Sequence, residues 1–120
     1  YMDWYKWHEA YDSSPTLQAR LRLASTHITQ ALEAVPYFKI QLVSVCAGDG
    51  RDVIGALINN PRRFQISASL VEINPALVGQ GNAALEQYGL KSQVQFLEAD
   101  ATLAATYETI APVDVLVVCG

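Results

Sequence analysis

Four short apolar segments, separated by stretches with helical character, constrain the fold of this chain more than any other feature. The segments are residues 40–46, 67–72, 94–98 and 113–118. Their Val, Ile and Leu content predicts buried strands, and the intervening segments are long enough to hold crossover helices. This alternation predicts an α/β fold with a Rossmann-like open parallel sheet and helices on both faces.

Helix boundaries are also marked in the sequence. Ser14-Pro15 and Asn74-Pro75 each combine a capping side chain with a proline suited to the first helical turn. After Pro15, apolar residues follow at gaps of three and four: Leu17, Leu21, Ala24, Ile28, Leu32 and Val35. Pro36 is expected to end this first helix, and Gly89 the one that begins at Pro75. A short helix is also expected after Thr102.

Two glycines inside the second of these helices lack a reason in the sequence. Gly79 and Gly81 each cost a helix about 1 kcal/mol relative to alanine. Neither lies at a predicted helix end, where glycine would serve as a cap.

The composition narrows the function classes. The chain has 120 residues, a net charge of −4 and 51% hydrophobic residues, as expected for one globular domain. Its acidic balance argues against nucleic acid or an anionic membrane as a partner. No apolar stretch approaches the roughly 20 residues of a membrane span, and no signal peptide opens the chain, so a cytoplasmic protein is expected. Two cysteines are too few for a disulfide framework or a zinc site, so no metal is expected.

The stretch "VSVCAGDGRD", residues 43–52, joins the first strand to the next helix by a glycine-containing turn. A dinucleotide fingerprint placed on Gly48 and Gly50 would require a third glycine where the chain has Val53, so the match is partial. Asp49 and Asp52 would bring negative charge close to a pyrophosphate. The loop therefore favours a nucleoside ligand that lacks phosphates and carries positive charge.

S-adenosylmethionine has this chemistry, and the sequence supplies carboxylates for it. Glu72 ends the second strand roughly 20 residues after Gly50, the spacing typical of an acid that binds ribose hydroxyls. Asp100 follows the third strand, where it could accept a hydrogen bond from the adenine amino group. Either acid could instead be a solvated strand end or a helix cap, and the glycines could serve only a tight turn.

With these motifs in place, residues 40 to 120 resemble the N-terminal part of a class I S-adenosylmethionine-dependent methyltransferase. The resemblance rests on "VSVCAGDGRD", "LVEINP", "EADA" and "VDVLVVCG". The N-terminal "DWYKWHEAYDSSPTLQARL" is similar to a group of uncharacterised bacterial methyltransferase-like proteins. The resemblance implies a helical segment at 1–38, followed at 39–120 by a cofactor-binding half-domain with about four strands of a usual seven, truncated after the fourth.

The resemblance also implies residue roles. The residues expected to bind the cofactor are Cys46, Ala47, Gly48, Asp49, Gly50, Glu72, Ile73, Asp100 and Ala101. The glycine loop would surround the methionine and ribose end, Glu72 would hold the ribose hydroxyls, and Ile73 would lie against the adenine. The backbone of Ala101, with Asp100, would contact the adenine edge, and Cys119 would lie near the methyl group.

Two residues depart from the family pattern. Cys46 stands where glycine is usual, and its side chain would narrow the approach of the ligand. Ser44 stands where an acid is frequent, so one contact to the methionine end would be weaker.

The methyl acceptor and the catalytic residues stay open. Tyr5, His8 and Tyr11 belong to an aromatic N-terminal cluster that could form a lid or a substrate contact, or could pack as a helix on its own domain. The acceptor is unknown, with a small molecule or a protein favoured over nucleic acid.

Two other functions remain: a fragment of a nicotinamide-dinucleotide oxidoreductase, or a non-catalytic cofactor-binding or interaction module. The strand at 113–118 is also expected to promote self-association through an unpaired edge.

Overall fold

A four-stranded parallel sheet organises the molecule. The computed structural model describes residues 15–36, 38–58, 60–108, 110 and 112–118. The strands are β1 (Ile40–Val45), β2 (Ile66–Glu72), β3 (Val94–Glu98) and β4 (Val115–Val118), in the spatial order β3-β2-β1-β4. All neighbouring pairs are parallel, with β1 paired to β2 from Ile40↔Ile66 onward. The Rossmann-like parallel sheet expected from the sequence is confirmed.

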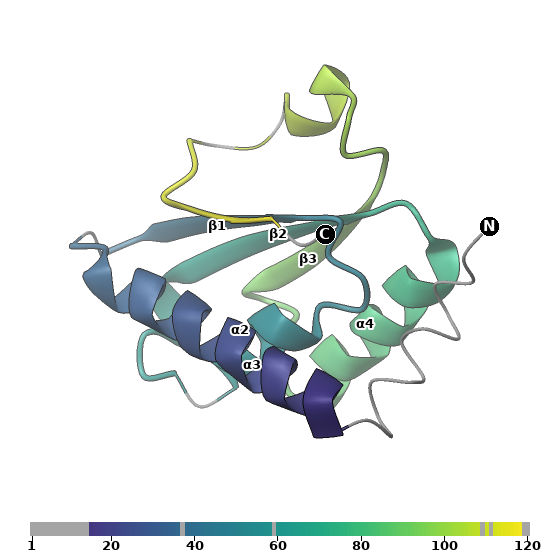
Figure 1. Ribbon diagram of the computed structural model, residues 1–120. Helices are drawn as coiled ribbons and strands as arrows, with labels where there is room; N and C mark the ends of the chain where they lie inside the picture. The colour runs from purple at the N-terminus through teal and green to yellow at the C-terminus, as the bar shows by residue number, and fades with distance from the viewer. Residues whose placement is uncertain (1–14, 37, 59, 109, 111, 119–120) are drawn as a thin grey trace.

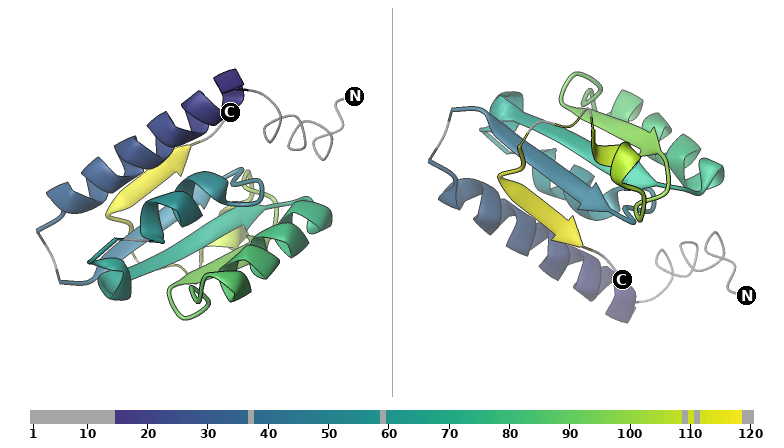
Figure 2. Two further views of the ribbon diagram at one scale, coloured as in Figure 1. Left: turned by 90° about the horizontal axis from the view of Figure 1, so that it is seen from below. Right: turned by 90° about the horizontal axis from the view of Figure 1, so that it is seen from above.

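The α-helices α2 (Pro15–Ala34), α3 (Arg51–Leu57) and α4 (Pro75–Gln87) all lie on one face of the sheet (Figure 1). On the opposite face the described chain has the short 3₁₀ helix η2 (Ala104–Tyr107) (Figure 2). Among the described residues the three α-helices therefore cover one face and η2 lies on the other, and the helix expected after Thr102 is this single 3₁₀ segment.

Right-handed crossovers explain this distribution. The chain moves from β1 to β2 to β3 in one direction across the sheet, which places α3 and α4 on the same face. It then returns to pair β4 with the other side of β1, so this connection passes over the opposite face. The strand order reverses between β1 and β4, which makes β1 a central strand. Within the described residues β4 has one paired neighbour, β1.

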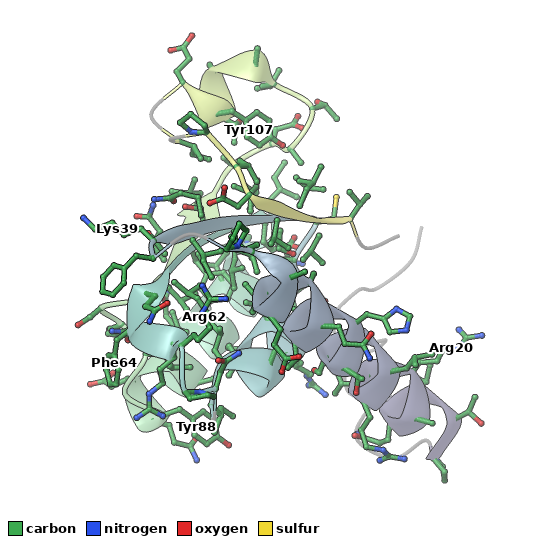
Figure 3. All side chains as sticks on the ribbon, turned by 90° about the vertical axis from the view of Figure 1, so that its left-hand side faces the viewer. Arg20, Lys39, Arg62, Phe64, Tyr88 and Tyr107 are labelled. Atoms are coloured by element: carbon green, nitrogen blue, oxygen red, sulfur yellow. The ribbon has the colours of Figure 1, made fainter. Side chains whose placement is uncertain are left out.

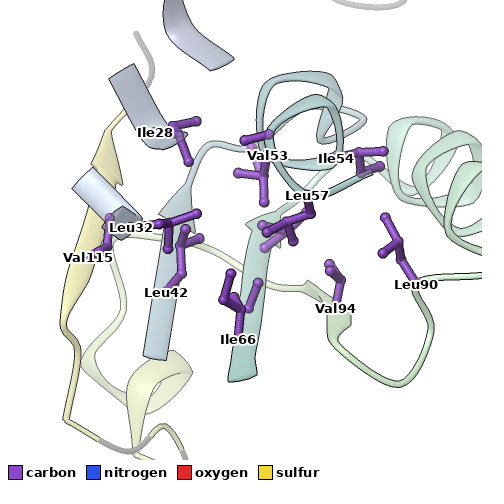
Figure 4. Close-up of a cluster of buried hydrophobic side chains, with 14 of the residues drawn as sticks. Ile28, Leu32, Leu42, Val53, Ile54, Leu57, Ile66, Leu90, Val94 and Val115 are labelled. Atoms are coloured by element: carbon purple, nitrogen blue, oxygen red, sulfur yellow. The ribbon is translucent and has the colours of Figure 1, made fainter. Parts of the chain in front are cut away.

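The hydrophobic core lies between this sheet and the three α-helices (Figure 4). Alternate residues of the strands face the helices, including the fully buried Leu42 and Leu70. From α2, Ile28 and Leu32 of the expected apolar stripe are buried against it. This burial supplies most of the stabilisation of the described fold. Among the described residues no helix combines the length and the hydropathy needed to cross a membrane.

The ends of α4 follow the sequence signals. The Asn74 side-chain oxygen accepts hydrogen bonds from the backbone N–H groups of Ala76 and Leu77, and Pro75 begins the helix. At the other end, Gly89 has a φ of 67°, and the N–H of Leu90 donates to the carbonyl of Leu85 at 2.9 Å. This is the left-handed glycine cap expected at Gly89.

Arg62 completes the end of α2, a role that the sequence did not indicate. Its Nη1 donates to the carbonyl oxygens of Leu32 and Val35, both at 2.9 Å (Figure 3). The last carbonyls of a helix lack intrahelical partners, and a cation beside them also complements the helix dipole. The short 3₁₀ helix η1 (Arg63–Gln65) follows directly, so this contact joins α2 to the start of β2.

Candidate functional site

The glycine-containing loop occupies the carboxyl end of β1, beside the point where the strand order reverses. Ligands of open parallel sheets bind at this position. Three residues of the loop have left-handed backbone conformations: Cys46, Gly48 and Gly50, with φ values of 54°, 63° and 77°. A backbone hydrogen bond joins the loop to β2, because the N–H of Ala47 donates to the carbonyl of Val71 at 3.0 Å.

Glu72, the last residue of β2, connects this loop to the next one along the sheet. Its Oε1 accepts the N–H of Gly48 at 2.8 Å, and its Oε2 accepts the N–H of Asn74 at 2.9 Å. Its own carbonyl accepts the N–H of Ala99 at 3.1 Å. Glu72 therefore lies in contact with the loops that follow β1, β2 and β3.

The Glu72 carboxylate keeps capacity for a ligand. An ionised carboxylate has about four lone-pair sites, and the two backbone N–H groups use one on each oxygen. One site on each oxygen remains for a hydroxyl donor. This matches the vicinal hydroxyl pair of a ribose, and the half-buried position of Glu72 favours such a contact.

Asp49 and Asp52 have local partners that the sequence did not indicate. Asp49 is buried, and its Oδ2 forms an ion pair with Nε of Arg51 at 2.6 Å. Asp52 is also buried, and its Oδ1 accepts the N–H of Val53 at 2.8 Å. Because Arg51 offsets the charge of Asp49, this carboxylate would repel a bound phosphate less strongly than we expected from the sequence.

Asp100 and Ala101 lie in a compact turn after β3. The Thr102 hydroxyl and the Thr102 N–H donate to Oδ1 of Asp100 at 2.6 and 2.8 Å, and both hydrogen bonds lower the pKa of this carboxyl below its ordinary value. The carbonyl of Ala101 accepts the Tyr107 hydroxyl at 2.6 Å. Both Thr102 hydrogen bonds therefore favour the ionised carboxylate of Asp100, and both use the same oxygen, Oδ1.

Two further residues border Glu72. Ile73 follows Glu72 directly and is 64% exposed, so its apolar side chain is accessible at the carboxyl end of β2. Glu98 is the register partner of Glu72 on β3 and adds a second carboxylate at this edge. Sequence reasoning missed Glu98, although its place as the last residue of the neighbouring strand was a usable signal.

The two departures from the family pattern have distinct structural consequences. Cys46 is exposed, and it is the one non-glycine residue with positive φ in the described chain. Ser44 is fully buried on the helix-facing side of β1, and within the described residues its hydroxyl has no hydrogen-bond partner. The serine that stands where the family often has an acid therefore makes no side-chain hydrogen bond among the described residues.

We expect Cys46→Gly to raise the free energy of unfolding by about 0.5–1 kcal/mol. A side chain in the left-handed region costs about 1–2 kcal/mol, and the greater freedom of glycine in the unfolded chain removes part of this gain. Chemical denaturation measures the change. Cys46→Ala is the control, because alanine keeps the backbone strain and removes only the thiol. A gain of equal size in both variants would contradict the backbone explanation.

Several expected residues lie outside the described part of the chain: Tyr5, His8, Tyr11 and Cys119. Their proposed roles stay predictions. Within the described ranges, no group of three His, Cys, Asp or Glu side chains is arranged to hold a metal ion.

Comparison with known proteins places the chain in context. A family model described as "Putative methyltransferase" matches residues 1–120. No curated protein matched the chain.

Three solved structures with the same fold are distant from this chain in sequence. A methyltransferase from Thiobacillus denitrificans, described as S-adenosylmethionine-dependent and crystallised with S-adenosylhomocysteine, has a TM-score of 0.62 and 20% identity; the match covers 81% of this chain and 36% of that one. TrmK of M. capricolum, bound to the same cofactor product, has a TM-score of 0.61 and 16% identity, with 84% and 40% covered. The [4+2]-cyclase SpnF has a TM-score of 0.57 and 22% identity, with 73% and 30% covered. The chain spans well under half the length of these three proteins, and the likeness shows the fold.

Proposed function

The chain belongs to the methyltransferase family whose model matches it from end to end, and from this premise we propose that it binds S-adenosylmethionine and donates the methyl group to an acceptor. The observation that carries the proposal is Glu72, whose carboxylate holds the glycine loop and keeps one acceptor site free on each oxygen. The S-adenosylhomocysteine bound to similar structures supports the same cofactor. The family assignment is needed as well, because a cyclase shares this fold.

The residues of this chain would bind and orient the cofactor. Glu72 would accept hydrogen bonds from both ribose hydroxyls, and the exposed Ile73 would cover one face of the adenine. Asp100 would accept a hydrogen bond from the adenine amino group through Oδ2, because Thr102 already bonds Oδ1. The bound cofactor supplies a methyl group on a positively charged sulfur, which an acceptor nucleophile displaces. The contribution of the protein is positioning and exclusion of water.

A small molecule or a protein is the proposed acceptor. The overall charge of −4 supports this, as does the acidic edge formed by Glu72, Glu98 and Asp100, because both would repel a polyanion. Methyl-transfer assays with candidate acceptors of each class, read by S-adenosylhomocysteine release, test the assignment. Release stimulated by RNA rather than by small molecules or proteins would overturn it.

Calorimetric titration of the chain with S-adenosylhomocysteine and with NAD tests the cofactor. We expect micromolar binding of S-adenosylhomocysteine, because its ribose and adenine meet Glu72, Ile73 and Asp100 without a phosphate near the acidic edge. Preference for NAD would replace the proposal with an oxidoreductase, an alternative that the Asp49–Arg51 ion pair leaves open. Binding without turnover for any acceptor class would instead favour a cofactor-binding module.

We also propose that the chain self-associates through β4. This strand has one paired neighbour among the described residues, contains no charge or proline, and exposes Leu116 and Val118 by 61% and 70%. An open groove of about 520 Å³ lies beside it, between residues 31–36 and 114–116. Such an edge pairs readily with a strand of a second copy. Light scattering should show dimers at high concentration and a monomer for Leu116→Lys; a wild-type monomer throughout would contradict this.

A further inference from the structure

The ring of Phe96 lies between α4 and the glycine loop. Phe96 is on the helix-facing side of β3 and is partly buried against the core. A methyl group built on Gly50 would lie 2.9 Å from its Cζ. A methyl group built on Gly81, in the middle of α4, would collide with the same Cζ and would lie 2.8 Å from Cε1. One ring end therefore contacts two backbones that come close because neither residue has a side chain.

The ring has little freedom to move. On one side it meets the helical backbone at Gly81, and on the other the loop backbone at Gly50. Leu70 closes part of the remaining space, since its Cδ1 lies 2.8 Å from the same built methyl group on Gly50. Protein interiors are close-packed, so a displacement of the ring is passed to its neighbours. A shift away from α4 would therefore press on Gly50.

Gly50 is a sensitive point of the loop. Its N–H donates to the carbonyl of Ala47 at 3.0 Å, and its carbonyl accepts the N–H of Ile54 at 2.8 Å. The first hydrogen bond closes the loop, and the second begins α3. A shift at Gly50 therefore alters the loop that presents the N–H of Gly48 to Glu72.

We propose that Phe96 is a positioning residue for the cofactor loop, and that it transmits the position of α4 at Gly81 to the loop at Gly50. The inference rests on the proposed function, in which this loop binds S-adenosylmethionine. It accounts for Gly81, which the sequence left unexplained. Its distinctive consequence is that a substitution within α4 weakens cofactor binding, and that shortening the ring restores it.

The test is a double-mutant cycle of Gly81→Ala and Phe96→Leu, because leucine lacks the ring end that alanine at position 81 would meet. Gly79→Ala is the matched control, since nothing lies within 4 Å of a methyl group there. Two quantities are measured in the full chain: amide hydrogen exchange at Gly48 and Gly50 without ligand, and affinity for S-adenosylhomocysteine.

We expect Gly81→Ala to weaken binding about tenfold and to speed exchange at both loop amides, while Gly79→Ala changes neither. In the double variant, binding should return to within about threefold of Phe96→Leu alone. If Gly81→Ala does not fold, the proposal still requires that Phe96→Leu alone accelerates amide hydrogen exchange at Gly50. Unchanged loop exchange in Gly81→Ala, or a double variant no better than Gly81→Ala, would overturn the inference. Absence of binding by the wild-type chain would count against the cofactor assignment, and the exchange measurements would still decide the role of Phe96.

Discussion

Replacing Gly50 by alanine is expected to lower the free energy of unfolding by about 1.5–4 kcal/mol. A φ of 77° costs a residue with a side chain about 1–2 kcal/mol, and the smaller freedom of alanine in the unfolded chain reduces this to about 0.5–1 kcal/mol. Overpacking adds about 1–3 kcal/mol, because the new methyl group would lie 2.8 Å from Leu70 Cδ1 and 2.9 Å from Phe96 Cζ. Urea unfolding followed by circular dichroism measures the sum.

Gly89 offers a matched control for this prediction. Its φ of 67° is similar, but nothing lies within 4 Å of a methyl group built there. Gly89→Ala should therefore cost only the net backbone component, about 0.5–1 kcal/mol. Equal losses in the two variants would mean that the contacts with Leu70 and Phe96 relax without cost.

Removing the Glu72 carboxylate should weaken S-adenosylhomocysteine binding by at least about 100-fold. Hydrogen bonds to a charged group contribute about 1.5–3 kcal/mol each, and Glu72→Ala removes those to the ribose while also releasing the N–H of Gly48. Glu72→Gln should retain part of the affinity. Its amide oxygen can accept one backbone N–H, whereas its nitrogen would face the other as a second donor. Calorimetry on all three proteins gives the affinities.

Glu98→Ala separates hydrogen bonding from charge. Glu98 is the register neighbour of Glu72 and carries the same charge, but no hydrogen bond to its carboxylate is seen in the described part of the chain. We expect its loss to change affinity less than about threefold, since exposed charges are well screened. Equal losses at Glu72 and Glu98 would show that general charge, and not the bridge to the loops, governs binding.

Much of the fold follows from local sequence signals. β3 spans the predicted Val94–Glu98, and β1 and β2 differ from the prediction by one residue. Asn74-Pro75 and Gly89 mark the ends of α4 because caps depend on adjacent residues only. The strand order, the single helical face and the role of Gly81 depend on contacts between distant segments. Gly81 is required by Phe96, which lies 15 positions away and packs against it only after β3 joins the sheet. Gly79 has no such neighbour, and nothing in the structure explains it.

The proposed site was predictable in position but less so in detail. The ends of β1, β2 and β3 must meet at one edge of a parallel sheet, so Gly48, Glu72 and Asp100 could be grouped from the sequence. The hydrogen-bond partner of each carboxylate could not be predicted from the sequence. Asp49 pairs with Arg51 and Asp100 with Thr102, each two residues away, because side-chain rotamers and turn geometry decide between competing donors. The hydrogen bond from the N–H of Gly48 to Glu72 depends on the left-handed backbone of the loop. A single sequence does not reveal this backbone conformation.

The position of β4 has a consequence for the order of folding. β1, β2 and β3 meet their neighbours through single crossovers, but Gln41 on β1 and Asp114 before β4, joined by a 2.8 Å hydrogen bond, lie 73 residues apart. Closing so long a loop costs conformational entropy before any contact is gained, and long-range pairings slow folding. The first three strands with α3 and α4 would then form the nucleus, and β4 would dock late. Substitutions such as Val115→Ala should accelerate unfolding and leave the refolding rate nearly unchanged, whereas Leu70→Ala should slow refolding. The strand added last would therefore govern how long the folded state persists, while the three formed first govern how quickly it is reached.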